Sequence, residues 1–199
     1  MVGDMTGSER NREMHALSDA YLVRDVAAGD RRAMDELMDK YMFIVSRTAY
    51  RILCDEAGSE EVTRRVFMKI WINASDYDES LSVSQWICRI VCAFCIGRLW
   101  RLRVLEAFSV RMPVYEMSAP QASDSEEDYI VKESWDIFCR ASRNLTPRQR
   151  VVYALTELEE ITEEDVSAIL GISCSRVRKN HSVAETKIRS ELELYGEVR

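Results

Sequence analysis

The sequence predicts an all-α protein made of two small helical domains joined by a flexible acidic linker. Its 199 residues include only seven glycines and three prolines, which argues against a fold of strands and tight turns. Apolar residues recur at intervals of three and four over long stretches, the spacing of one buried stripe on an α-helix. This periodicity stops at 112–128, where two of the three prolines and a run of acidic residues fall together. We therefore expect a domain boundary there.

The overall composition is that of a water-soluble globular protein, with 47% hydrophobic and 31% charged residues. No apolar run approaches the roughly 18 residues that a membrane-spanning helix needs. The first 13 residues are polar and of mixed charge, so neither a signal peptide nor membrane insertion is expected. The expected location is the cytoplasm, where the six cysteines would be reduced and act as small apolar side chains.

The first domain is expected at 18–104, after a polar tail at 1–17. It should contain four helices, the first of which ends at Gly29, a residue suited to a left-handed cap. Residues 73–83 are polar and predict a loop. Both Trp71 and Trp86 are expected in the core. The four helices are expected to begin at Ser18 or Asp19, Asp30, Ser59 and about Ser84, and the last to end near Arg103.

The linker is expected at 105–126 and the second domain at 127–199. Thr146 as N-cap, Pro147 at the first helical position and Gln149 three residues after the cap predict a strong helix start. The later part of this domain reads as helix, tight glycine turn and helix, which is the helix-turn-helix pattern. The helix before the turn is expected to begin at Thr162 and end at Gly171, and the last helix to begin at Ser173.

Charge alternates along the chain, although the net charge is −7. Residues 87–111 contain five basic groups and one acidic group, whereas 112–136 contain one basic group and seven acidic groups. Local charge decides whether a surface attracts phosphates, so an acidic protein can still present basic faces. We interpret the 87–111 segment as a face for nucleic acid, with a solvated face paired to nearby carboxylates as the alternative.

Several short motifs stand in a distinctive order. They are Gly29-Asp30, Tyr41, Arg51-Ile52-Leu53, Ser59 to Phe67, Lys69-Ile70-Trp71, Trp86 to Ile90, Leu145 to Arg150, and Gly171-Ile172-Ser173 followed by Val177. Together they resemble the extracytoplasmic-function (ECF) group of bacterial sigma factors, in the sigma-70 superfamily. The resemblance covers about 20–103 and 127–194. Each motif is weak alone, and their order and spacing carry the identification.

The resemblance implies a factor that binds core RNA polymerase and directs promoter recognition, melting and transcription initiation, with an anti-sigma factor as a further candidate partner. The first domain would dock on the clamp helices of the largest polymerase subunit through Glu60, Glu61, Arg64 and Phe67. It would hold the melted −10 element through the loop at 74–85 and through Trp86, Arg89, Arg98, Trp100, Arg101 and Arg103. The second domain would read the −35 element in the major groove through Ser173, Ser175, Arg176, Arg178, Lys179 and Ser182.

The chemistry of these residues suits those roles. Melted DNA exposes phosphates and unstacked bases, so its binder needs cations interleaved with aromatic rings. A recognition helix needs short polar and basic side chains near its N-terminus to reach base edges and phosphates. An acidic linker repels DNA, and we expect it to avoid the duplex.

Two other functions are kept as alternatives. The chain departs from the family pattern at Glu61, Arg64, Ala93 and Gly97, which motivates a helix-turn-helix regulator that binds duplex DNA without acting as an initiation factor. A module that only sequesters a protein partner is the third hypothesis. No phosphate-cradling glycine loop, nucleophile elbow or metalloprotease motif is present, so neither an enzyme nor a cofactor is expected.

The spacing of three cysteines on one predicted helix raises the question of a metal site. Cys88, Cys92 and Cys95 share one helix face, but a tetrahedral zinc site needs four converging ligands and no nearby histidine completes the set. We expect three small buried residues and no metal.

Overall fold

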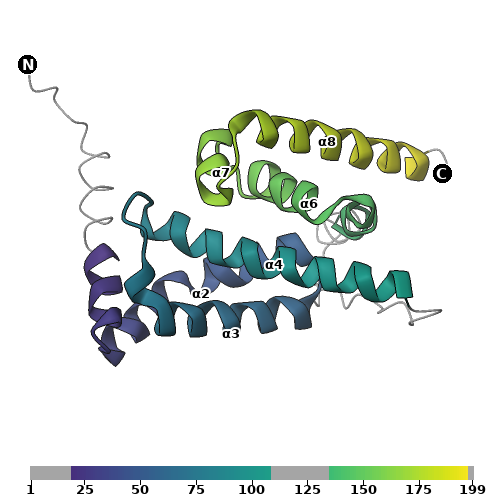
Figure 1. The fold of residues 1–199 in the computed structure, drawn as a ribbon. Helices are drawn as coiled ribbons and strands as arrows, with labels where there is room; N and C mark the ends of the chain where they lie inside the picture. Colours follow the sequence, from purple (N-terminus) through teal and green to yellow (C-terminus); the bar gives the residue numbers. More distant parts are fainter. Residues whose placement is uncertain (1–18, 109–134, 197–199) are drawn as a thin grey trace, which may run out of the picture.

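Helices make up all the regular structure of the described residues, 19–108 and 135–196, in this computed structural model (Figure 1). This confirms the all-α expectation. The tail expected at 1–17 and most of the linker expected at 105–126 lie outside these residues. The elements are a helical segment at 19–27, α2 (Arg31–Leu53), α3 (Glu56–Asn73), the 3₁₀ turn η1 (Ala74–Asp76), α4 (Val83–Phe108), a helical segment at 135–141, the 3₁₀ turn η2 (Ser142–Asn144), α6 (Pro147–Tyr153), the π-helical turn η3 (Ala154–Leu158), α7 (Glu163–Leu170) and α8 (Cys174–Gly196).

The N-terminal part is a bundle in which α2, α3 and α4 pack against one another (Figure 1). Asp30 caps α2 as expected, and its carboxylate accepts a hydrogen bond from the backbone N–H of Arg32 at 2.8 Å. The apolar stripes on these helices face one another, and their largest side chains are fully buried. Those side chains include Leu37, Ile52, Ile70 and Ile87.

The C-terminal part consists of α6, η3, α7 and α8, with α8 lying across α6 in Figure 1. Gly171 ends α7 with φ +62°, a left-handed conformation that glycine adopts without steric cost. The chain then turns into α8, so the expected helix, glycine turn and helix are present in order.

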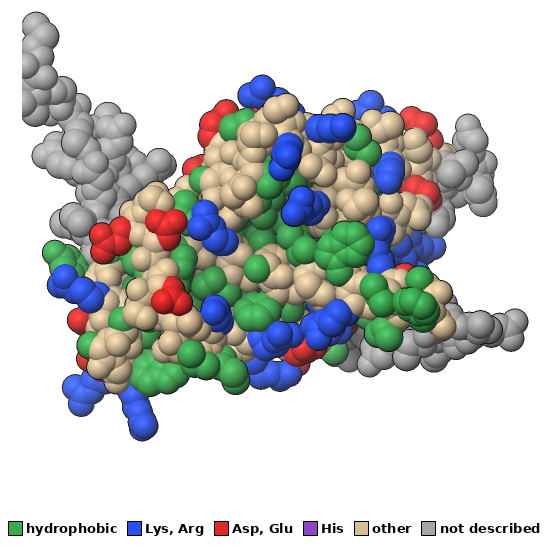
Figure 2. Space-filling model, in the orientation of Figure 1, with side chains coloured by type: hydrophobic (Ala, Val, Ile, Leu, Met, Phe, Trp, Pro, Cys, Tyr) green, Lys and Arg blue, Asp and Glu red, His purple; other side chains and the backbone are tan. Residues whose placement is uncertain are grey.

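The two parts pack against each other and share one hydrophobic core. Helix α4 contacts both α6 and α7, and η3 contacts α2. Side chains of the C-terminal part, including Val151, Leu155 and Ile169, belong to the same buried cluster as Leu37 and Ile70 of the first bundle. Figure 2 shows hydrophobic side chains, with several Lys or Arg side chains beside them, along the seam between the two parts. We call this the closed arrangement.

Helix α3 begins four residues earlier than the sequence predicts. Asp55 is its N-cap residue, whereas Ser59, the expected cap, lies inside the first turns and donates a hydrogen bond to the carbonyl of Glu56. Gly58 therefore lies in the helix, not in a turn. A Cβ at this position would lie 2.5 Å from Nε of Arg98, so the glycine lets α4 approach closely.

Helix α4 is longer and more apolar than expected. It extends to Phe108, beyond the limit of 104 set for the first domain. It is also the single helix among the described residues that is long and apolar enough to cross a membrane by those two criteria, which corrects the expectation of no such run. Because α4 packs against α2, α3, α6 and α7, its apolar character is that of the central helix of a bundle.

The start of α6 has the expected capping box. The backbone N–H of Gln149 donates to Oγ1 of Thr146 at 3.3 Å, and the N–H of Thr146 donates to Oε1 of Gln149 at 3.0 Å. Two backbone donors at the helix start are thereby satisfied by side chains.

Replacing Thr146 with alanine should lower the free energy of unfolding by about 1 kcal/mol, because one N-terminal donor of α6 loses its acceptor. Urea denaturation followed by circular dichroism would measure the change. Thr186→Ala is the matched control, because Thr186 lies exposed in the middle of α8 and bonds only to a backbone carbonyl of its own helix. Equal losses in the two variants would contradict the capping role.

Candidate nucleic-acid interface

Trp86 does not lie on the surface of the bundle. Its side chain is 6% exposed and packs edge-on against the ring of Tyr77, with centroids 5.2 Å apart. This confirms Trp86 as a core residue and corrects its expected display toward melted DNA, because a buried ring offers no face on which a base could stack. Trp71 differs in the opposite sense, since it was expected in the core and is 39% exposed.

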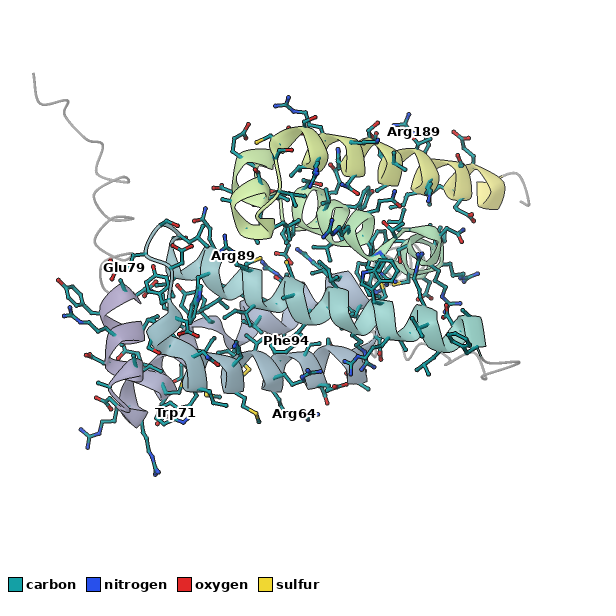
Figure 3. The ribbon with its side chains drawn as sticks, in the orientation of Figure 1. Arg64, Trp71, Glu79, Arg89, Phe94 and Arg189 are labelled. Atoms are coloured by element: carbon teal, nitrogen blue, oxygen red, sulfur yellow. The ribbon has the colours of Figure 1, made fainter. Side chains whose placement is uncertain are left out.

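Arg89 points from α4 toward the end of α7 (Figure 3). Its Nε donates to the carbonyl of Ile169 at 3.0 Å and its Nη2 to the carbonyl of Ala168 at 2.7 Å. Asp78 lies 3.5 Å from Nη1. A cation at these carbonyls satisfies unpaired acceptors at the C-terminus of α7 and complements the helix dipole. The guanidinium thus joins the two parts of the molecule.

Two further arginines of the expected −10 group also have partners within the protein. Arg98 forms ion pairs with Asp55 at 2.9 Å and Glu61 at 2.5 Å, both at the start of α3. Arg103 donates to the carbonyl of Leu145 at 2.6 Å, which is a second link between the two parts. In the closed arrangement, the expectation that these cations are displayed outward is therefore wrong.

The remaining two members of that group are at the surface. Trp100 is 51% exposed and Arg101 is exposed beside it on α4. Counting charges along the sequence could not separate Arg101 from Arg89 and Arg103, because the acceptors of the latter two are main-chain carbonyls. Such acceptors leave no trace in the charge pattern.

The expected −35 residues lie at and just after the turn into α8. All six side chains are exposed, and five of them are those of Ser173, Ser175, Arg176, Lys179 and Ser182. Arg178 is exposed too, and its Nε donates to Oε2 of Glu163 at 2.7 Å. That hydrogen bond and the charge of Glu163 raise the pKa of Arg178 above its already high value, so it stays a cation. Val177 is fully buried and anchors this end of α8.

The expected docking residues on α3 divide into surface and core. Glu60 and Arg64 are exposed, and Arg64 lies on the outer side of α3 in Figure 3. Glu61 is committed to ion pairs with Arg65 and Arg98. Phe67 is 4% exposed and belongs to the core, so its expected place on a docking face is wrong.

The structure reveals exposed apolar residues on α3 that the sequence analysis did not include. Met68, Trp71 and Ile72 expose between 39% and 66% of their surface, next to the buried Phe67 and Ile70. The helical periodicity could have found Met68 and Ile72, because they fall outside the buried stripe of this helix. It could not have found Trp71, which the same periodicity assigns to the core.

A buried carboxylate links α2 to the C-terminal part, and sequence reasoning missed this link. The side chain of Glu159 is 5% exposed and forms ion pairs with Arg47 at 2.6 Å and Arg51 at 3.3 Å. It also accepts a hydrogen bond from the hydroxyl of Thr48 at 3.2 Å. We call Glu159 and these three partners the Glu159 latch. A nearby contact, from Gln85 on α4 to Asp165 on α7 at 2.8 Å, supports the same arrangement.

Known proteins resemble the chain over most of its length. The sequence family described as "Sigma-70, region 4" matches residues 139–188. The ECF RNA polymerase sigma factor SigW of Bacillus subtilis is 20% identical, covering 85% of this chain and 94% of that protein. The ECF RNA polymerase sigma factor SigK of Mycobacterium tuberculosis strain H37Rv is 26% identical, and the match covers 87% of this chain and 92% of SigK. The ECF RNA polymerase sigma factor SigE of Mycolicibacterium smegmatis is 24% identical to this chain, and the match covers 83% of this chain and 65% of SigE.

Two solved structures share the fold. CnrH, in complex with the cytosolic domain of CnrY, gives a TM-score of 0.60 at 19% identity and covers 88% of this chain and 97% of CnrH. The sigma factor RpoE of Bartonella quintana, in complex with the anti-sigma factor NepR, gives 0.60 at 16% identity, with coverages of 80% and 96%. The chain is thus similar to the ECF group of sigma-70 factors over most of its length, and its segment 139–188 matches sigma-70 region 4.

The region that matches sigma-70 region 4 runs from the end of the 135–141 segment into α8. It therefore includes the helix, glycine turn and helix, the exposed residues from Ser173 to Ser182, and Glu159 of the latch. Those surface residues lie in the part of the chain that the family match covers.

The cysteines of α4 lie where the sequence predicts. Cys92 and Cys95 are fully buried and Cys88 is half-buried, so the three act as small residues facing the core. The hydrogen bond with Cys88 and then burial raise the pKa of Cys92, and burial raises the pKa of Cys95. Both are therefore thiols and not thiolates at neutral pH.

Proposed function

We propose that this chain is an ECF sigma factor, which binds core RNA polymerase and directs promoter recognition, melting and transcription initiation. The observation that carries the proposal is the row of exposed Ser, Arg and Lys side chains on α8, directly after the glycine turn in the segment that matches sigma-70 region 4. Short polar and cationic side chains at the start of a helix suit contacts with base edges and phosphates in the major groove. This helix would read the −35 element.

The melted −10 element would be held by α4. Trp100 and Arg101 already lie at the surface, and an exposed ring beside a cation suits unstacked bases next to phosphates. Arg89 and Arg103 would join them once the two parts separate, because both are tied to carbonyls of the C-terminal part in the closed arrangement. Promoter binding would thus require an open arrangement.

Polymerase docking is assigned to the outer side of α3. Glu60 and Arg64 supply charged contacts, and the adjacent Met68, Trp71 and Ile72 supply apolar area that water contacts in the free protein. Burial of exposed apolar side chains drives most protein association, with charged residues at the rim setting orientation. Phe67 would support this surface from below.

An anti-sigma factor is a further proposed partner. The two structures that share the fold are complexes, one with the cytosolic domain of CnrY and one with the anti-sigma factor NepR. A protein that stabilises the closed arrangement would keep Arg89 and Arg103 away from DNA. Such an anti-sigma factor would therefore inhibit DNA binding without covering every DNA-binding residue itself.

Transcription in vitro with core polymerase from the source organism tests the proposal. We expect transcripts that start at specific promoters and depend on the added protein. Binding to duplex DNA without association with core polymerase would instead identify a helix-turn-helix regulator. Absence of both activities in a folded sample would leave a protein-interaction module.

Arg178→Ala should weaken binding to a −35 duplex by about ten- to a hundredfold and reduce the salt dependence of the affinity by about one phosphate contact. Fluorescence anisotropy over a salt series would measure both quantities, with core polymerase present. Arg189→Ala is the matched control, because Arg189 is also exposed and ion-paired on α8 but lies beyond the row of DNA-contact candidates (Figure 3). If both variants bind equally well, α8 does not read DNA through Arg178.

A further inference from the structure

Two cysteines far apart in the sequence meet at the seam between the two parts. Cys54 directly follows α2, and Cys139 lies in the 135–141 segment. Both side chains are nearly or fully buried, with exposed fractions of 5% and 1%, and each thiol shifts the pKa of the other. Sγ of Cys54 also lies 3.9 Å from Oγ of Ser142, which in turn donates to the carbonyl of Cys139 at 2.9 Å. Ser142 thus connects the end of α2 to the 135–141 segment.

The backbone holds Cys54 in an unusual conformation. Its φ of +49° is left-handed, and its N–H donates to the carbonyl of Tyr50 to end α2. Glycine occupies the left-handed positions at Gly29 and Gly171, after two other helices. A side chain at such a position costs conformational energy, which the surrounding contacts must offset. The Cys54 side chain is therefore directed by a rigid cap.

A buried cation lies beside the two thiols. Arg150 is almost fully buried, and its Nη2 donates to the carbonyl of Leu53 at 2.8 Å, while its Nε has no hydrogen-bond partner among the described residues. The hydrogen bond from Cys139, followed by the charge of Arg150, lowers the pKa of Cys54 to about 6 in spite of burial. The same hydrogen bond, with burial, raises the pKa of Cys139. The two shifts have opposite directions, so of the two cysteines Cys54 more readily forms the thiolate and Cys139 keeps its proton.

We propose that Cys54 and Cys139 form a reversible disulfide that ties the end of α2 to the C-terminal part and holds the protein in the closed arrangement. The oxidant is a small hydroperoxide, which reaches Cys54 during partial opening of the seam. The thiolate attacks the peroxide oxygen, takes up one oxygen as sulfenic acid and releases water or an alcohol. The thiol of Cys139 then attacks the sulfenic sulfur and displaces water, so the two cysteines lose two hydrogens in total. A cellular dithiol reverses the reaction by thiol–disulfide exchange.

The bond would regulate access to nucleic acid. With Cys54 and Cys139 joined, Arg89 and Arg103 stay next to the carbonyls that hold them in the closed arrangement. The proposed bond is argued from the common contacts of Cys54 and Cys139 with Ser142 and from their burial, whereas this effect on transcription rests on the proposed function. An oxidised factor would be silent and a reduced one active.

Mass spectrometry on the intact chain tests the bond. The fully reduced protein, freed of reductant, is exposed to equimolar hydrogen peroxide, alkylated and digested without reduction. We expect one peptide pair that links Cys54 to Cys139, a loss of two of the six titratable thiols, and recovery of both with dithiothreitol. Linkage of other cysteines, or oxidation without any linkage in the folded protein, would overturn the proposal.

Serine variants complete the test. Cys54→Ser and Cys139→Ser should each abolish the linked peptide, whereas Cys174→Ser, at the start of α8, should retain it. Circular dichroism confirms that each variant is folded. In a second arm, reduced protein drives transcription with core polymerase, and peroxide lowers this activity at least tenfold in the wild type but not in Cys54→Ser. If the reduced protein fails to initiate, the proposed function fails, and if it initiates but never forms the bond, the disulfide fails.

Discussion

Replacing Glu159 with glutamine should open the molecule. The substitution keeps the size of the side chain but removes the charge that Arg47 and Arg51 share at the seam. Breaking a buried ion pair costs about 3–5 kcal/mol, and we expect about 2 kcal/mol here because both arginines are partly exposed and regain water. A change of about 2 kcal/mol raises the ratio of open to closed molecules roughly 30-fold.

Small-angle X-ray scattering and binding to a single-stranded −10 oligonucleotide would detect this opening. The radius of gyration should rise, and affinity for the oligonucleotide should rise with it, because Arg89 and Arg103 lose their carbonyl partners in the C-terminal part. Glu160→Gln is the matched control, since Glu160 is the exposed neighbour with the same charge. An unchanged scattering curve in Glu159→Gln would show that the latch does not hold the closed arrangement.

Phe67→Asp should unfold the N-terminal bundle. The ring of Phe67 is 4% exposed within the core of α2, α3 and α4, so a carboxylate there would be buried among apolar side chains without a partner. We expect a loss of more than about 4 kcal/mol, a large fraction of the stability of a typical domain. Thermal denaturation followed by circular dichroism would show a lower midpoint or no cooperative transition.

Arg64→Glu separates folding from docking. Arg64 is exposed on α3 one turn from Phe67, so reversing its charge should leave the thermal transition almost unchanged. If the outer side of α3 docks on polymerase, the same variant should bind core polymerase more weakly in a pull-down or by surface plasmon resonance. A folded Phe67→Asp protein would contradict the placement of this residue in the core.

Local signals in the sequence predicted most of the helices. Asp30, Thr146 and Thr162 cap the helices that they were expected to cap, because a side-chain acceptor next to free backbone donors acts within a few residues. The start of α3 was misplaced for a nonlocal reason. Gly58 looks like a turn residue in the sequence, and only the approach of Arg98 from α4 explains a glycine inside that helix.

The sequence predicted which kinds of residue form the candidate site, but it predicted correctly for only some of them that they lie on the surface. The cationic and polar residues after Gly171 lie on the surface, as a short turn followed by an amphipathic helix requires. The cations of α4 are mostly engaged within the protein, and the sequence contains no sign of this because their partners are main-chain carbonyls or distant carboxylates.

The sequence by itself determined the helices, their caps and the resemblance to ECF sigma factors, since each depends on neighbours along the chain or on the order of motifs. Only the tertiary structure decided which cations are free to meet DNA, that Phe67 lies inside and Trp71 outside, and that Cys54 lies beside Cys139. The physical reason is that burial and charge pairing depend on which helix faces pack together. In the closed arrangement, that packing joins residues about a hundred positions apart, such as Thr48 and Glu159.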